Sequence, residues 1–332
     1  MNILVTGGAG FIGSNLVTAL VNEGHRVVVL DNLSTGSLSN LTSVANDISF
    51  VEGDILNPDH VESEVRNAEL VYHLAAAVGV GNIMANPLES IFTNTTGTEH
   101  VLRSCHRHAT RVVIASTSEI YGKTPKLPMA EDDDRILGST AISRWSYSTS
   151  KALDEHLAFA FATEGLRTSI VRYFNSYGPH LDEKGYGSVI ANFIRQARDG
   201  EPLTVHGDGL QTRCFTFVAD TVRGTILAGT KDDALGSVFN IGSNFEISIA
   251  DLARLIVDKT RSSSPITNIS YEQRYGTSFS DTRRQSGWPR VSIARSHGGT
   301  PFTRDPRRTH RHPHQHWRAI GHSGIASRRP LR

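Results

Sequence analysis

A glycine-rich turn near the start of the chain constrains the fold more than any other feature. It reads Gly7-Gly8-Ala9-Gly10-Phe11-Ile12-Gly13, follows a strand-like stretch at residues 2–6 and precedes a helical pattern. In that context Gly7, Gly10 and Gly13 let backbone amides and a helix N-terminus approach a pyrophosphate. Because a tight turn can also use glycine only for packing, the turn alone is weak evidence for a dinucleotide site.

Short β-branched runs alternate with longer amphipathic stretches over the first two-thirds of the chain. The expected strands are 2–6, 26–30, 48–52, 70–73, 111–115 and 168–173, and the expected helices are 11–23, 88–107, 147–163 and 188–198. This alternation predicts βαβ units and an α/β fold with a doubly wound parallel (Rossmann) sheet. We expect a Rossmann domain at 1–175, with a further strand near 237–241, and a smaller interleaved C-terminal substrate lobe at 176–284.

Asp31 indicates which cofactor the glycine turn would bind. It ends the expected second strand, 18 residues past Gly13, where a carboxylate can accept hydrogen bonds from an adenosine ribose and repel a 2′-phosphate. No Lys or Arg lies between Asp31 and Arg66 to attract such a phosphate. The turn, its position and Asp31 together predict NAD as the cofactor, preferred to NADP.

Composition argues against several other classes of protein. The 332 residues are 38% hydrophobic, so the chain can bury a sizeable core, yet no run approaches the roughly 18 apolar residues of a membrane helix. Two cysteines, Cys105 and Cys214, are too few for a disulfide framework or a structural metal site. Residues 1–282 carry 22 basic and 32 acidic residues, which disfavours nucleic-acid binding. We expect a cytoplasmic protein with no metal.

Tyr147 and Lys151 are the clearest candidate catalytic pair. They lie four residues apart in Tyr147-Ser148-Thr149-Ser150-Lys151, on one face of an expected helix. Because an ammonium favours a nearby phenolate, we expect Lys151 to lower the pKa of Tyr147 toward that of a general base. Such pairs are also common on solvated helices. Thr117 favours catalysis, because it follows the expected strand 111–115 and strand C-termini face the ligand crevice of a doubly wound sheet.

Seven segments, taken in order, resemble the extended short-chain dehydrogenase/reductase family. These are the NAD-dependent nucleotide-sugar epimerases, decarboxylases and dehydratases, and the match runs from residue 1 to about residue 284. The segments are Gly7–Gly13, Asp31–Gly36, Gly53-Asp54, His73–Ala76, Ser116–Gly122, Tyr147–Lys151 and Arg172–Pro179. The resemblance also implies a homodimer. One departure is His180, which stands where many relatives have an arginine.

The resemblance implies a role for each matching residue. Thr117, Glu119, Tyr147 and Lys151 would be catalytic. The cofactor would be held by Tyr147 and Lys151 and by Gly7, Gly10, Phe11, Ile12, Gly13, Asp31, Asn32, Ser34, Gly36, Asp54, Ile55, Leu74, Ala75 and Ala76. The nucleotide sugar, which we expect to be UDP-linked, would be bound by Thr117, Asn175, Val189, Arg213 and Arg284.

The implied chemistry is transient oxidation of the sugar at C4. Tyr147 would take the O4 proton while C4 gives hydride to NAD. The bound 4-keto sugar would then be reduced on its other face (4-epimerisation), lose carbon dioxide from a C6 carboxylate (decarboxylation), or lose a C5 proton and the 6-hydroxyl (4,6-dehydration).

Thr117-Ser118-Glu119 resembles UDP-glucuronate decarboxylases and some dehydratases, and the segment Arg144-Trp145-Ser146-Tyr147 also resembles the decarboxylase branch. Decarboxylation is therefore favoured narrowly over UDP-glucose 4-epimerisation, and 4,6-dehydration comes third. A non-catalytic NAD-binding regulator is the alternative from another class, and it is disfavoured because Thr117, Tyr147 and Lys151 are all present.

Residues 285–332 differ in composition from everything before them. Residues 283–332 contain twelve Arg, six His, one acid and no Lys, without hydrophobic periodicity. A basic tail could serve as a polyanion tether, but here it replaces sequence that, by the resemblance, should complete the substrate lobe. Out-of-frame reading of a GC-rich gene yields such sequence, so we predict a frameshift shortly after Arg284.

Overall fold

The computed structural model describes residues 1–79, 83, 85–181 and 188–270, and its centre is a seven-stranded sheet. The strands are arranged in the order β11-β6-β5-β4-β1-β2-β3, and every pairing is parallel. Their bounds are β1 Asn2–Thr6, β2 Arg26–Asp31, β3 Ile48–Glu52, β4 Leu70–His73, β5 Arg111–Thr117, β6 Thr168–Tyr173 and β11 Val238–Ile241. The prediction of a doubly wound parallel α/β fold is confirmed.

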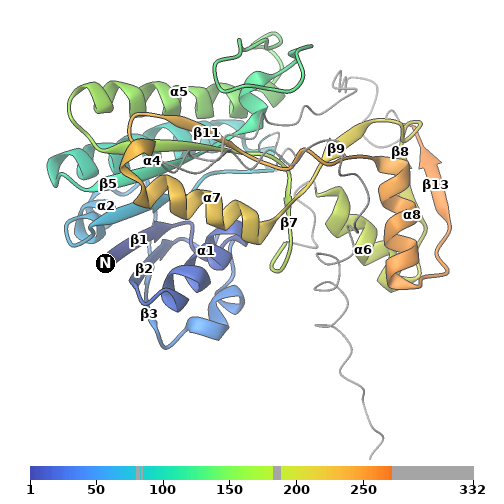
Figure 1. The fold of residues 1–332 in the computed structure, drawn as a ribbon, viewed down its shortest axis with the longest axis horizontal. Helices are drawn as coiled ribbons and strands as arrows, with labels where there is room; N and C mark the ends of the chain where they lie inside the picture. The colour runs from blue at the N-terminus through green and yellow to red at the C-terminus, as the bar shows by residue number, and fades with distance from the viewer. Residues whose placement is uncertain (80–82, 84, 182–187, 271–332) are drawn as a thin grey trace, which may run out of the picture.

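Helices cover both faces of this sheet (Figure 1). On one face lie α1 (Phe11–Asn22) and α7 (Val218–Thr230), with the short 3-10 helix η1 (Leu38–Val44) beside α1. On the other lie α2 (Pro58–Val65), α4 (Pro87–Arg107) and α5 (Arg144–Thr163). Gly24 and Gly165, which follow α1 and α5, have φ of +82° and +95°, a left-handed conformation that glycine adopts without strain after a helix.

Two cores result from the alternation of side chains along each strand. Ile3 and Val5 of β1 pack with α1 and α7, whereas Leu4 between them packs with the residues of α2, α4 and α5. Val71 and Tyr72 of β4 divide in the same way. Since both faces of a parallel sheet are covered, its strands are apolar throughout rather than half polar.

A smaller lobe lies at one end of the sheet, on the right of Figure 1. It contains α6 (Val189–Asp199), α8 (Ile249–Thr260) and the parallel pair β8 (Leu203–His206) and β13 (Ile266–Ile269), packed around their own apolar cluster. Two further pairs connect it to the sheet: β7 (Ser176–Tyr177) with β10 (Thr216–Phe217), and β9 (Thr212–Cys214) with β12 (Glu246–Ser248). Between these segments, α7, the 3-10 helix η3 (Asp232–Ala234) and β11 return to the large sheet.

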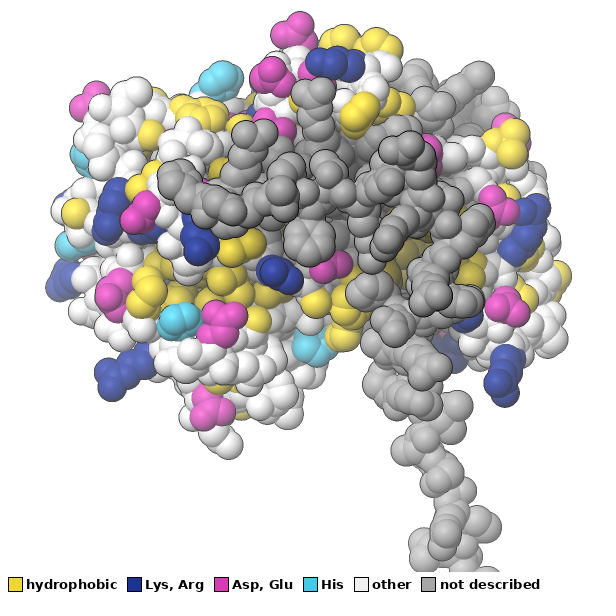
Figure 2. All heavy atoms as spheres, viewed as in Figure 1, with side chains coloured by type: hydrophobic (Ala, Val, Ile, Leu, Met, Phe, Trp, Pro, Cys, Tyr) yellow, Lys and Arg dark blue, Asp and Glu magenta, His cyan; other side chains and the backbone are white. Residues whose placement is uncertain are grey.

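The described surface mixes charges of both signs. On the face that Figure 2 shows, Lys and Arg side chains are scattered among Asp and Glu side chains. Within the described ranges no helix is long and apolar enough to cross a membrane. Cys105 and Cys214 are both buried and free. Arg284 and the predicted frameshift lie outside the described residues.

Candidate active site

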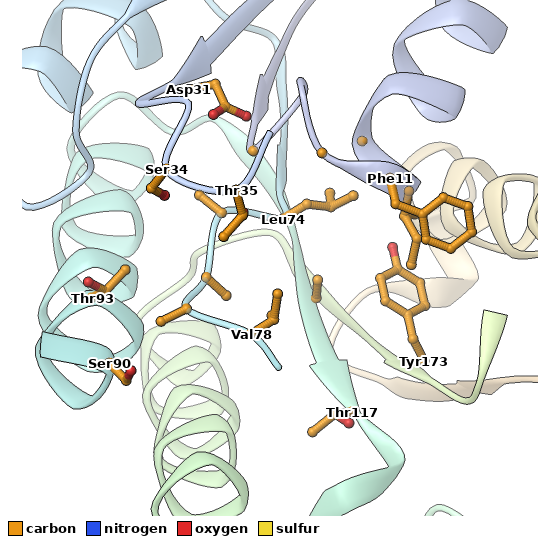
Figure 3. Close-up of a pocket in the computed structure, with 18 of the residues that line it drawn as sticks. Phe11, Asp31, Ser34, Thr35, Leu74, Val78, Ser90, Thr93, Thr117 and Tyr173 are labelled. Atoms are coloured by element: carbon orange, nitrogen blue, oxygen red, sulfur yellow. The ribbon is translucent and has the colours of Figure 1, made fainter. Parts of the chain in front are cut away.

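A pocket of about 750 Å³ opens along the carboxyl ends of the sheet strands. It lies where the chain reverses direction across the sheet: β2 and β3 follow β1 on one side, and β4, β5 and β6 continue on the other. In doubly wound sheets ligands bind at such a switch point. Figure 3 shows Asp31 at one end of the pocket and Thr117 at the other, with Ser90 and Thr93 on one side and Phe11 and Tyr173 opposite.

The glycine turn brings the N-terminus of α1 to this pocket. Gly7, Gly10 and Gly13 line it, and a Cβ added to Gly13 would lie 2.1 Å from the carbonyl oxygen of Gly7. Gly7 itself has φ of +71° and would place a Cβ 2.6 Å from the nitrogen of Ala75. No side chain of the described residues caps the start of α1, so its first amides are available to an anion such as a pyrophosphate.

The carboxylate of Asp31 connects two loops beside this turn. Its Oδ2 accepts a hydrogen bond from the amide of Ala9 at 2.9 Å, and its Oδ1 accepts one from Leu33 at 2.8 Å. Because a carboxylate can accept about four hydrogen bonds, Asp31 retains capacity for the hydroxyls of a ribose. The geometry of Asp31 therefore fits the NAD cofactor.

The loop after β3 contributes to the end of the pocket at which Asp31 lies. Asp54 and Ile55 line it, and Asn32 donates from Nδ2 to Asp54 at 3.1 Å. Gly97 of α4 makes room for Ile55, since a Cβ there would lie 2.5 Å from its Cδ1. Asn32 and Ser34 also line the pocket, whereas Gly36 supports it from outside by packing against Ala9.

The loop after β4 forms a third wall, which Asn94 holds in place. Leu74, Ala75 and Ala76, which the resemblance implies would hold the cofactor, line the pocket. The buried Asn94 of α4 accepts from the amide of Ala77 at 2.7 Å and donates back to its carbonyl at 3.2 Å. Sequence reasoning missed Asn94, and it also missed four pocket-lining residues: Asn86, which precedes α4, and Glu89, Ser90 and Thr93 of α4. Polar residues recurring along one face of an expected helix were the available signal.

All four predicted catalytic side chains line the opposite end of the same pocket. Thr117 ends β5, Glu119 lies in the 3-10 helix η2 (Ser118–Tyr121), and Tyr147 and Lys151 lie in α5. Thr117 and Tyr147 are joined by a side-chain hydrogen bond. Arg144 faces Glu119 with Nη2 3.9 Å from Oε2. A phenol, a hydroxyl and a carboxylate thus converge on one volume.

The predicted effect of Lys151 on Tyr147 is not seen in this structure. Burial raises the pKa of Tyr147, the negative charge of Glu119 raises it further, and only the hydrogen bond from Thr117 opposes this. Lys151 points its Nζ at Asp154 Oδ2 instead, at 3.2 Å, and both side chains are buried. The spacing of Tyr147 and Lys151 predicted a shared helix face correctly, but it could not predict the carboxylate beside the lysine.

Four of the five predicted substrate residues form two groups in the structure, and the fifth, Arg284, lies outside the described residues. Thr117 and Asn175 line the pocket, and Asn175 Nδ2 donates to the carbonyl of Cys214 at 3.3 Å. Val189 packs into the core of the smaller lobe, and Arg213 donates from Nη1 to the carbonyl of Thr212, so neither lines the described pocket. His180 also lines the pocket and contacts Ser14 Oγ through Nδ1 at 2.9 Å.

Comparisons with known proteins agree with this site. Residues 3–242 match the model of the NAD dependent epimerase/dehydratase family. The chain is 43% identical over 279 residues to a UDP-N-acetyl-alpha-D-glucosaminuronate decarboxylase of Bacillus cytotoxicus. The aligned residues make up 84% of this chain and 86% of that protein. It is 37% identical to UDP-glucuronic acid decarboxylase 1 of Xenopus tropicalis, over 82% of this chain and 63% of that protein.

Solved structures give the same result. The UDP-glucose 4-epimerase of Thermotoga maritima, solved with UDP-glucose, superposes with a TM-score of 0.78 at 31% identity and covers 87% of this chain and 89% of that one. The chain therefore belongs to the NAD-dependent epimerase/dehydratase family. The resemblance drawn from the motifs is confirmed, as is the prediction of an NAD-dependent enzyme.

Proposed function

We propose that this enzyme decarboxylates a UDP-linked hexuronate through transient oxidation at C4. The observation that carries the proposal is Glu119, a carboxylate in the same pocket as Thr117 and Tyr147. Two curated relatives named decarboxylases support it, one acting on UDP-glucuronic acid and the other on its N-acetylated 2-amino counterpart.

Each proposed step assigns a proton or charge to a residue of the pocket. Tyr147, hydrogen-bonded to Thr117, takes the proton of the sugar O4. NAD, when bound, would accept the hydride from C4 and later return it. The resulting C4 ketone is β to the C6 carboxylate, so the C5–C6 bond breaks, carbon dioxide leaves, and its bonding electrons form the C4–C5 enolate. Tyr147 hydrogen-bonds to the enolate oxygen while C5 takes one proton from water, a delivery that Glu119 controls. Return of the hydride to C4 and of the Tyr147 proton to O4 completes the pentose.

The experiment is a substrate panel with the purified protein and NAD. UDP-glucuronate, its 2-acetamido counterpart, UDP-glucose and UDP-N-acetylglucosamine are incubated separately, and products are identified by NMR. We expect a UDP-pentose and carbon dioxide from a uronate substrate. Formation of 4-epimers only would replace decarboxylation with epimerisation, the alternative that the epimerase structures favour.

Three variants assign the roles. Tyr147→Phe should reduce turnover by roughly 10²–10⁴-fold while NAD still binds. Glu119→Gln should stall after oxidation and accumulate NADH absorbance, because hydride removal does not require that carboxylate. Glu99→Gln, at an exposed pair with Arg103, is the matched control and should behave as wild type. Unchanged decarboxylation in Glu119→Gln would remove Glu119 from the mechanism.

We also propose that the enzyme is a homodimer formed through α4 and α5. These helices pack side by side and expose large apolar side chains: Leu88 and Phe92 of α4 are 67% and 51% exposed, and Leu153 of α5 is 46% exposed. Apolar side chains grouped on neighbouring helices are typical of an interface. Sedimentation should show a dimer that Phe92→Asp dissociates and that Leu210→Asp, at another exposed leucine, leaves intact.

A further inference from the structure

A chain of buried polar side chains runs beneath the pocket from α5 to β1. Asp154 receives Lys151 Nζ at 3.2 Å and a hydrogen bond from Thr98 of α4. Thr98 Oγ1 lies 3.0 Å from His73 Nε2, and His73 Nδ1 lies 2.8 Å from Thr6 Oγ1. Lys151 is 3% exposed and the other four residues are fully buried.

The end of this hydrogen-bonded chain at β1 contacts the loop after β4, which forms one wall of the pocket. Thr6 Oγ1 accepts a hydrogen bond from the amide of Ala75 at 3.3 Å, and Ala75 lines the pocket. The chain therefore joins two pocket features that are far apart in sequence, the ammonium of Lys151 and the loop after β4. Nothing in the helix pattern of α5 requires an acid here, because the position faces the protein interior.

Hydrogen-bond chemistry gives the chain one direction. An ionised carboxylate only accepts, so the single proton of Thr98 goes to Asp154. Thr98 must then accept from His73 Nε2–H, which leaves His73 Nδ1 to accept the proton of Thr6. The side-chain protons of Thr98, His73 and Thr6 each have an acceptor when Asp154 carries its negative charge. Burial raises the pKa of Asp154, and the charge of Lys151 and the hydrogen bonds from Lys151 and Thr98 oppose that shift.

We propose that Asp154 is a positioning residue for catalysis, which holds Lys151 as a charged ammonium at a fixed place in the pocket. The proposal rests on the proposed roles of Tyr147 and Lys151. One of the three Lys151 N–H groups is directed to Asp154, and Lys151 also lines the pocket. A buried cation is costly without an opposite charge beside it. Lys151 therefore needs Asp154 in order to remain charged in its buried position.

Other charges around the pair do not replace Asp154. Glu155 is the next carboxylate along α5, but its oxygens bind Arg172 and Ser116. Glu119 acts on Tyr147 from η2, and neutral His73 faces the pair from β4, where burial and the charge of Lys151 lower its pKa to about 3. Asp154 is therefore the carboxylate in contact with Lys151.

The test follows the charge of Lys151 directly by NMR. The chain has six lysines, so selective ¹³Cε-lysine labelling gives few signals, and Lys151→Met identifies the one from Lys151. Asp154→Asn is nearly isosteric and removes the charge. We expect the titration midpoint of Lys151 to fall by at least about one pH unit, a tenfold change in its proton affinity. Thr98→Val, which removes the hydrogen bond but not the charge, should move the midpoint much less.

Activity gives a second readout. With the uronate substrate, the alkaline limb of the rate profile should move to lower pH in Asp154→Asn in step with the NMR midpoint, and Asp154→Glu should restore part of it. A merely structural role would lower stability without moving that limb. An unchanged Lys151 midpoint in Asp154→Asn overturns the proposal.

A third measurement needs no variant at the acid. In the wild type, ¹⁵N shifts should show His73 as the Nε2–H tautomer, and the Nδ1–H tautomer would overturn the directed chain. Both NMR experiments are independent of turnover, so absence of product with every sugar would refute the proposed function without deciding the role of Asp154.

Discussion

Replacing Glu155 with glutamine tests whether a buried ion pair holds the catalytic end of β5. The Glu155 carboxylate accepts two hydrogen bonds from Arg172, from Nε to Oε1 at 2.9 Å and from Nη2 to Oε2 at 2.7 Å. Ser116 donates to the same carboxylate. Arg172 also donates to Tyr121 Oη at 2.7 Å. The side chains of Arg172 and Glu155 are 8% and 6% exposed, so solvent cannot compensate for a lost partner.

The expected cost follows from leaving Arg172 charged and buried. Removing one partner of a buried ion pair costs roughly 3–5 kcal/mol, most of it the penalty of the uncompensated charge. For a body of this size, that loss corresponds to a decrease in Tm of roughly 6–20 °C. Because Ser116 precedes Thr117, Glu155→Gln should also lower turnover while Tyr147 is intact.

Urea and thermal unfolding of purified variants measure this cost. Glu99→Gln breaks an exposed ion pair, in which Arg103 is 62% and Glu99 38% exposed, and should cost only about 0–1 kcal/mol. The double variant Glu155→Leu/Arg172→Met removes both charges and should be more stable than Glu155→Leu alone. A loss below about 1 kcal/mol in Glu155→Gln would refute the argument that the buried charge dominates.

Four further predictions address the cofactor, acid stability and the C-terminus. Gly13→Ala places a Cβ 2.1 Å from the Gly7 oxygen, so NAD affinity measured by fluorescence titration should fall at least about tenfold, whereas Gly24→Ala, with open space around it, should not change that affinity. Asp31→Ala should narrow the preference for NAD over NADP, and a wild type that prefers NADP would contradict this assignment. Hydrogen bonds from His108 and Ser104 lower the pKa of Glu62 to about 2, so its stabilisation is complete above pH 4.5 and is lost as the pH falls toward 2; the stability difference between wild type and Glu62→Gln should shrink across that window, and a constant difference would refute the effect. Translating the gene in its other two frames after Arg284 should reveal an amphipathic continuation rich in Leu and Glu, and if neither frame contains one the frameshift hypothesis fails.

The sheet and its cofactor end were predictable from sequence because their determinants are local. Alternating apolar runs, the spaced glycines and Asp31 at a strand end each act within a few residues of where they occur. The bounds of β1, β3, β4 and β6 match the expected ones, and β5 extends two residues further, to Thr117. Those two residues, Ser116 and Thr117, line the pocket.

The substrate end was less predictable because it depends on distant pairings. Arg213 is fixed by β9, whose partner β12 lies more than thirty residues later, and Val189 is fixed by packing of α6 in the smaller lobe. Asp154 carried no local signal, and Asn94 carried only that of a polar residue recurring on one face of an expected helix. Each is one polar residue among several on a helix, and its role appears only when Ala77 or Lys151 is placed beside it.

Two adjacent acids on α5 illustrate why placement decides function. Successive residues of a helix point about 100° apart, so Asp154 and Glu155 cannot share a partner. Asp154 turns toward Lys151 and the cofactor wall, whereas Glu155 turns toward Arg172 and Ser116 at the end of β5. The same change from carboxylate to amide should therefore act differently at the two positions. At Asp154 the change should shift the pH at which Lys151 titrates. At Glu155 it should lower the stability of the carboxyl end of β5, which carries Thr117.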